Sequence, residues 1–194
     1  MRMNITVQKY VYYKNAKDKK GIFMLQMLYP DEYLDSTYTI DFKKLYKDGY
    51  RGILFDIDNT LVPHGAPADK RAITLFKKLR EIGFQTCLIS NNKEPRVKSF
   101  CDKVGSAYVF KAGKPLPGGY EEGIRRMKTT KENTLFIGDQ IFTDVLGAKR
   151  AGLHAIMVKP IHPKEEIQIV LKRYLEKVVL FFYFRSIRKK SVEK

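Results

Sequence analysis

The sequence has few of the features that assign a protein to a class at once. Its two cysteines, Cys87 and Cys101, form neither a CxxC motif nor a zinc-ligand pattern. Both lie in apolar surroundings, so we expect reduced core thiols and a cytoplasmic protein rather than a disulfide-bonded secreted one. The three histidines are scattered along the chain, and we assign none of them to catalysis.

Long apolar runs are also missing. The longest, residues 178–184, has seven residues, whereas roughly 20 are needed to cross a bilayer. Residues 1–20 contain no continuous apolar stretch of the kind found in a secretory signal peptide. We therefore expect neither a transmembrane helix nor a signal peptide.

Acidic residues are scarce relative to basic ones, since 21 Asp and Glu face 37 Lys and Arg, a net charge of +16. The excess is concentrated at the two ends. Residues 1–20 hold six basic residues and one acidic, and residues 164–194 hold nine and four. Such ends favour contact with an anionic membrane or with nucleic acid, or they serve solubility alone. Nucleic acid is the less favoured partner, because the chain has no RNA-binding motif or zinc knuckle.

Hydrophobic periodicity predicts alternating strands and helices. We expect strands at 52–55, 84–89, 107–110, 135–137 and 155–158, with helices at 41–48, 68–82, 94–104, 118–127 and 143–151. This alternation predicts an α/β protein with a Rossmann-like, three-layer fold around a central parallel sheet of five strands. We divide the chain into a basic N-terminal extension (1–23), an α/β domain (24–163) and a basic amphipathic C-terminal helix or tail (164–194).

The C-terminal segment is a long helix candidate. Apolar residues recur from Ile167 onward at the spacing of one helix face. We expect residues 167–178 to pack on the sheet as its last helix. The aromatic cluster at 181–184, flanked by Arg and Lys, suits a membrane interface or a partner, so residues 178–190 are the candidate surface for an anionic membrane.

Polar side chains follow four of the predicted strands. They are Asp56, Asp58 and Thr60; Ser90 and Asn91; Lys114; and Asp139 with Asp144. Because parallel strands end at one edge of the sheet, where open α/β sheets bind ligands, we expect these side chains to share a site. Asp56 and Asp58 point the same way from a strand, and such a pair of like charges needs a cation or a proton between them.

These residues lie in motifs that resemble those of the haloacid dehalogenase (HAD) superfamily of phosphotransferases. The motifs are Asp56-x-Asp58-x-Thr60, Ser90, Gly113-Lys114-Pro115-Leu116-Pro117 and Gly138-Asp139-Gln140-Ile141-Phe142-Thr143-Asp144, and the match spans residues 52–158. Short linkers after Thr60 and after the third strand leave no room for a large cap domain, as in subfamily IIIA. With the lead-in at residues 28–33, the motifs are similar to the YqeG-type branch of that subfamily, which is itself similar to mitochondrial phosphatidylglycerophosphate phosphatases.

The resemblance implies a Mg²⁺-dependent phosphomonoester hydrolase that works through an aspartyl phosphate. Asp56 would be the nucleophile, and Asp58 would protonate the leaving oxygen and then activate water. Lys114 would stabilise the phosphate charge, with Lys111 as the alternative lysine.

The resemblance also assigns ligands. Asp56, Asp139 and the backbone carbonyl of Asp58 would hold Mg²⁺, and Asp144 would support them. The phosphate-binding residues would be Thr60, Ser90, Asn91 and Lys114.

Three functions remain open at this point. The first is hydrolysis of a phospholipid, plausibly phosphatidylglycerophosphate, by a protein bound peripherally at the inner face of a membrane. The alternative is a phosphatase for a soluble sugar phosphate or nucleotide, which an open site also permits. The third is a basic RNA- or ribosome-associated module.

Overall fold

A computed structural model of the chain describes residues 25–162 and 167–192. The proposed N-terminal extension, residues 1–23, lies outside the described residues. Among the helices that are described, none is long and apolar enough to cross a membrane.

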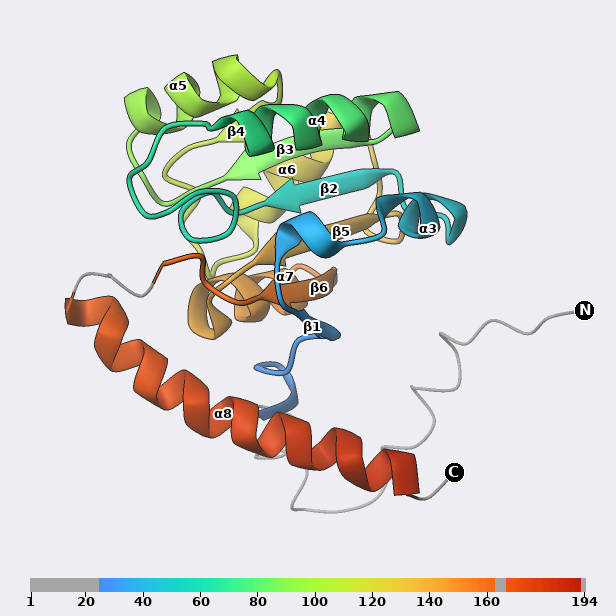
Figure 1. Cartoon of the computed structure of the whole chain (residues 1–194), viewed down its shortest axis with the longest axis vertical. Helices are drawn as coiled ribbons and strands as arrows, with labels where there is room; N and C mark the ends of the chain where they lie inside the picture. Colours follow the sequence, from blue (N-terminus) through green and yellow to red (C-terminus); the bar gives the residue numbers. More distant parts are fainter. Residues whose placement is uncertain (1–24, 163–166, 193–194) are drawn as a thin grey trace, which may run out of the picture.

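A single parallel sheet forms the centre of the structure (Figure 1). Its six strands lie in the order β1-β6-β5-β2-β3-β4. Their bounds are β1 (Glu32–Leu34), β2 (Gly52–Phe55), β3 (Gln85–Ile89), β4 (Ala107–Val109), β5 (Thr134–Gly138) and β6 (His154–Val158). The parallel, Rossmann-like α/β fold expected from the alternating pattern is therefore confirmed.

The expected count of five strands was wrong, because the sheet has a sixth strand at one edge. Strand β1 has three residues and pairs with β6, placing Glu32 opposite Ile156 and Leu34 opposite Val158. A segment this short carries no periodic pattern of its own. Its strand conformation comes from pairing with a segment far along the chain, and local sequence does not report such pairing.

Helices cover both faces of the sheet, which makes three layers (Figure 1). Helices α3 (Phe42–Lys47), α4 (Lys70–Ile82) and α5 (Glu94–Val104) pack on one face, and α6 (Gly118–Met127) and α7 (Leu146–Arg150) on the other. Alternate side chains of β2 point to opposite faces of the sheet and pack against the two helix layers. Phe55 packs against Phe76 of α4, whereas Leu54 lies in the same core as Ile124 of α6.

Two details of the chain connections matter for the site. The links from β2 to α4 and from β4 to α6 contain no helix or strand, so the described domain has no cap inserted at either place. The helix expected at 143–151 is instead a π-helical turn, η2 (Ile141–Val145), followed by α7.

A short 3-10 turn, η1 (Thr37–Thr39), precedes α3. Cys87 and Cys101 are buried free thiols, as expected.

Helix α8 (Ile167–Val192) is 26 residues long and runs along the β1 and β6 side of the domain (Figure 1). Glu176, Val179 and Tyr183 are buried on its inner side. The ring of Tyr183 also contacts that of Tyr29, at 5.6 Å between centroids. Its exposed large side chains are Tyr174, Leu175, Val178, Phe181, Phe182, Phe184 and Ile187, although the ring of Phe184 also contacts that of Tyr33 in β1.

For residues 173–178, whose side chains the structure describes, this arrangement corrects the expectation that residues 167–178 pack their apolar face on the sheet. The structure leaves Tyr174, Leu175 and Val178 exposed and turns Arg173 and Glu176 inward. The physical reason is that the domain surface beneath α8 offers buried polar groups, which charged side chains satisfy and apolar ones cannot.

Candidate active site

Strand β2 delivers Asp56 to the carboxyl edge of the sheet, where its backbone N–H donates to the carbonyl of Ile137 at 2.9 Å. The Asp56 side chain is buried, and the Lys114 ammonium donates to its Oδ1 at 2.5 Å and to Asp144 Oδ1 at 2.8 Å. One buried cation thus holds two carboxylates from different loops. Burial raises the pKa of Asp56 to about 7, although the Lys114 charge opposes the rise.

For Lys114, neighbouring charges affect the pKa more strongly than burial does. Burial alone would lower the pKa of its ammonium group, but the Asp144 and Asp56 carboxylates outweigh burial and raise it. Lys114 is therefore positively charged at neutral pH. Lys111, the alternative, is exposed and has a backbone φ of 45°. The lysine that contacts Asp56 is therefore Lys114 rather than Lys111.

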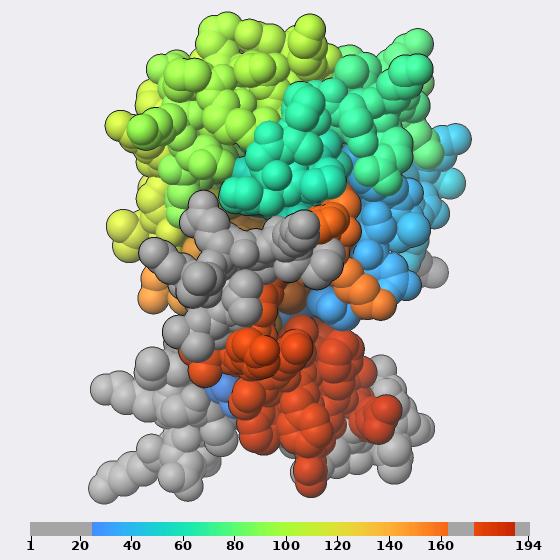
Figure 2. All heavy atoms as spheres, turned by 60° about the vertical axis from the view of Figure 1, so that its left-hand side comes forward, coloured from blue at the N-terminus to red at the C-terminus, as the bar shows by residue number. Residues whose placement is uncertain are grey.

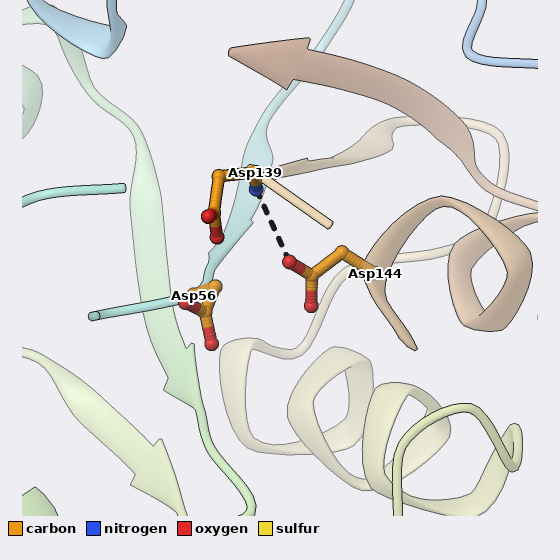
Figure 3. A group of neighbouring side chains, drawn as sticks. All are labelled: Asp56, Asp139 and Asp144. Carbon is orange, nitrogen blue, oxygen red and sulfur yellow. Dashed lines mark hydrogen bonds between the residues drawn. The ribbon is translucent and has the colours of Figure 1, made fainter. Parts of the chain in front are cut away.

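Asp56, Asp139 and Asp144 form a buried carboxylate cluster (Figure 3). Each contributes an oxygen atom within 4.8 Å of the other two. The pKa of Asp139 is raised by its burial and by the neighbouring Asp144 charge, so this group gains from any cation placed beside it. Carboxylate oxygens converging in this way fit a hard divalent cation.

Asp144 is held in place by the turn that follows β5. Its Oδ2 accepts from the backbone N–H of Asp139 at 3.1 Å (Figure 3) and from that of Gln140, also at 3.1 Å. A Cβ at Gly138 would lie 2.6 Å from this oxygen, so only glycine lets the carboxylate come this close to the strand end. The Tyr120 hydroxyl donates to the carbonyl of Thr143 at 2.9 Å and holds the same turn from α6.

Asp58 lies beside the cluster rather than in it. Its Oδ2 accepts from Asn92 Nδ2 at 2.7 Å, and its Oδ1 accepts from Arg96 Nη2 at 3.0 Å and from the Gly65 N–H at 2.8 Å. Arg96 also donates to the Ala66 carbonyl at 2.7 Å, which ties α5 to the loop after β2. Neither Asn92 nor Arg96 was predicted as a site residue, because no local motif marks either one.

The remaining candidates link the loops to one another. Thr60 Oγ1 donates to Asp139 Oδ1 at 3.2 Å. Asn91 exchanges two hydrogen bonds with the backbone of Lys114, at 3.1 and 2.8 Å. Buried Ser90 accepts from the Asn92 N–H at 3.1 Å. The structure therefore gathers the loops of β2, β3 and β5 and the Lys114 loop at one edge of the sheet.

Helix α8 adds a residue that the sequence did not suggest. Arg173 donates from Nη1 to the Asp139 carbonyl at 2.6 Å and from Nη2 to the Asp139 carboxylate. Arg173 Nη1 also pairs with Glu176 Oε2 at 2.8 Å, while Glu176 Oε1 accepts from the Ile141 N–H at 2.6 Å. Burial raises the pKa of Glu176, and Arg173 opposes that rise.

Parts of this chain are similar in sequence to known proteins. Residues 66–152 match a family described as haloacid dehalogenase-like hydrolases. The probable phosphatase YqeG of Bacillus subtilis (strain 168) is 37% identical over 152 residues, which cover 78% of this chain and 88% of that protein. The chloroplastic and mitochondrial phosphatidylglycerophosphate phosphatase 1 of Arabidopsis thaliana is 25% identical over 166 residues, covering 77% of this chain and 45% of that protein.

Among solved structures, one similar chain is the cobalt-bound deoxy-D-mannose-octulosonate 8-phosphate phosphatase YrbI of Haemophilus influenzae. It aligns with a TM-score of 0.49 at 14% identity and covers 74% of this chain and 93% of its own length.

Proposed function

The chain belongs to the haloacid dehalogenase-like hydrolase family and is a phosphatase, and we propose that it hydrolyses a phosphomonoester through an aspartyl phosphate on Asp56. The family expected from the motifs is confirmed by these relatives. The roles of individual residues are our proposal, and they rest on the arrangement of side chains at the sheet edge. The observation that carries it is the buried Asp56 carboxylate held by Lys114 within the acidic cluster.

In the first half of the reaction, a carboxylate oxygen of Asp56 attacks phosphorus and the bond to the ester oxygen breaks. Asp58 gives its proton to the departing oxygen, so the alcohol leaves neutral. Lys114 holds the Asp56 carboxylate in place and balances the charge of the phosphoryl group. Thr60, Ser90 and Asn91 complete the phosphate-binding loops.

In the second half, water attacks the phosphorus of the aspartyl phosphate and the Asp58 carboxylate accepts its proton. Inorganic phosphate leaves and Asp56 is regenerated. A Mg²⁺ ion held by Asp56, Asp139 and the Asp58 carbonyl, with Asp144 in support, would neutralise the phosphoryl oxygens. Nucleophilic attack, proton transfer and phosphate binding are assigned to side chains at the same edge of the sheet.

Chemistry and metal are tested together by following phosphate release from a phosphomonoester. We expect turnover that requires Mg²⁺, ceases with a chelator and returns when the ion is restored. The Asp56→Asn protein is the blank, since its amide is a poor nucleophile. Turnover that survives in the chelated protein would contradict the metal site.

We further propose that the substrate is a phospholipid such as phosphatidylglycerophosphate, reached at a membrane surface. The outer side of α8 supports this, because exposed aromatic and aliphatic side chains lie beside Arg185 and Arg188. Figure 2 shows the described part of α8 as a projection beneath the domain. Phe181, Phe184 and the two arginines line a hollow of about 470 Å³. Rings flanked by cations suit the interface of an anionic membrane.

The substrate proposal is tested with phosphatidylglycerophosphate in mixed micelles beside a panel of soluble phosphomonoesters. Strong preference for the lipid supports a peripheral protein at the inner face of a membrane. Preference for a sugar phosphate or nucleotide keeps the phosphatase chemistry and rejects the lipid. In parallel, a chain lacking residues 178–194 should no longer sediment with anionic vesicles; unchanged sedimentation would reject the membrane role of α8.

A further inference from the structure

Helix α8 reaches the carboxylate cluster through two side chains. Arg173 contacts both the carboxylate and the backbone carbonyl of Asp139, and Glu176 accepts from the N–H of Ile141 just beyond it. Arg173 and Glu176 also pair with each other. This part of α8 is therefore fastened to the proposed metal site rather than to the apolar core.

Both side-chain oxygens of Asp139 are engaged. The guanidinium of Arg173 takes Oδ2, and the hydroxyl of Thr60 donates to Oδ1. Asp139 is fully buried, and a buried carboxylate is stable only with a cation or hydrogen-bond donors beside it. A guanidinium and a divalent ion both supply that charge, but two cations at one carboxylate oxygen repel each other.

We propose that Arg173 and a divalent cation are alternative partners of Asp139, so that binding of the ion loosens α8 from the domain. The inference rests on the metal site in the proposed function and adds to it a residue that regulates access to that site. Contact with Asp139 makes Arg173 a competitor of the ion. Helix α8 is the element that responds.

The remaining contacts of α8 allow such a response. Among the described side chains of α8, residues 173–188, Val179 and Tyr183 are buried against the domain, and Leu180 and Phe184 contact it while partly exposed. The other large apolar side chains of this stretch are exposed. Coupling of this kind is reciprocal. If the ion weakens docking of α8 by a given factor, release of α8 from Asp139 must strengthen binding of the ion by the same factor. An anionic lipid surface that binds α8 would have this effect.

The first measurement is the affinity for Mg²⁺ by calorimetric titration of the full chain. The Arg173→Gln protein should bind Mg²⁺ roughly tenfold more tightly than the original, within the range usual for coupled sites. Lys177→Gln is the matched control, because Lys177 lies on the same helix over the Tyr174 ring and loses the same charge. Its affinity should equal that of the original chain. Asp139→Asn should lose most of the binding and thereby locate the ion.

The second measurement is amide hydrogen exchange of residues 173–188. Mg²⁺ should accelerate exchange in the original chain, while Arg173→Gln should exchange fast with or without the ion. Equal Mg²⁺ affinity of the Arg173→Gln and original proteins, or exchange in α8 that Mg²⁺ leaves unchanged, overturns the inference and leaves the metal site standing. A folded original chain that binds no Mg²⁺ overturns the metal site and the inference with it.

Discussion

The carboxylate cluster and the outer side of α8 depart from the usual distribution of side chains in opposite directions. At the sheet edge, Asp56, Asp139 and Asp144 are buried although they are acidic. On α8, Phe181 and Phe182 are 59% and 46% exposed although they are apolar. Both arrangements cost free energy in an isolated domain, because water solvates charges well and aromatic rings poorly.

The two regions differ in how that cost is met. The cluster has its partners within the chain, since Lys114 bridges two of its carboxylates and Arg173 holds the third. The outer rings of α8 remain exposed in the part of the chain that the structure describes. Charge buried with internal partners is typical of a catalytic centre, and exposed apolar area is typical of a surface that meets something else.

The largest effect is expected at Asp56, the proposed nucleophile. Asp56→Asn should lower kcat by roughly 10⁴-fold or more, the scale seen when a nucleophile is removed. The fold should survive, because Lys114 keeps Asp144 as a partner. Turnover and thermal unfolding measured on the same sample separate the two effects. Near-normal turnover would remove Asp56 from its proposed role.

The second test removes the internal partner of the cluster. Lys114→Met leaves buried carboxylates without their cation and should cost about 3–5 kcal/mol in the free energy of unfolding, besides abolishing activity. Lys111→Met is the matched control, since Lys111 is exposed. It should change neither quantity. Denaturant unfolding of both variants checks the result, and equal stabilities would mean that Lys114 does not hold the cluster together.

The third test removes the exposed rings. Phe181→Ser combined with Phe182→Ser should weaken binding to anionic vesicles by roughly 30-fold, since each ring contributes about 1 kcal/mol when half of it enters the interface. Ile73→Ser is the control, because Ile73 is 40% exposed on α4, away from α8. Vesicle flotation compares the two proteins. Equal losses in both would indicate nonspecific adhesion.

The smallest effect is expected at Arg96, which positions Asp58 without belonging to the cluster. Arg96→Gln should lower kcat about tenfold and leave KM nearly unchanged, because it disturbs the orientation of Asp58, the proposed acid and base, rather than substrate binding. Arg125→Gln on the surface of α6 is the control and should match the original chain. A change confined to KM would instead assign Arg96 to substrate binding.

Sequence alone predicted the parts of the site that lie in local motifs. Asp56, Lys114, Asp139 and Asp144 each follow a strand, and parallel strands end at one edge, so their meeting follows from topology. The lysine of the Gly-Lys-Pro-x-Pro motif was preferred over Lys111 from the motif alone, and the structure brings it to Asp56.

The rest depends on contacts between distant segments. Arg173 meets Asp139 across 34 residues, and Arg96 meets Asp58 across 38, and neither pair leaves a local pattern. Periodicity identified an apolar face on the last helix, but it cannot tell whether such a face turns inward. That outcome was decided by the buried polar groups beneath α8, which bind Arg173 and Glu176.

The edge strand β1 also bears on the order in which the protein folds as it is synthesised. Glu32 meets His154 across 122 residues, so β1 cannot pair until β6 has left the ribosome. By then β2 to β5 and the loops bearing Asp56, Lys114 and Asp144 have already emerged. During synthesis the N-terminal part of a chain leaves the ribosome before the C-terminal part. All three residues of the carboxylate cluster are therefore available before Arg173, whose contact with Asp139 is among the last to form.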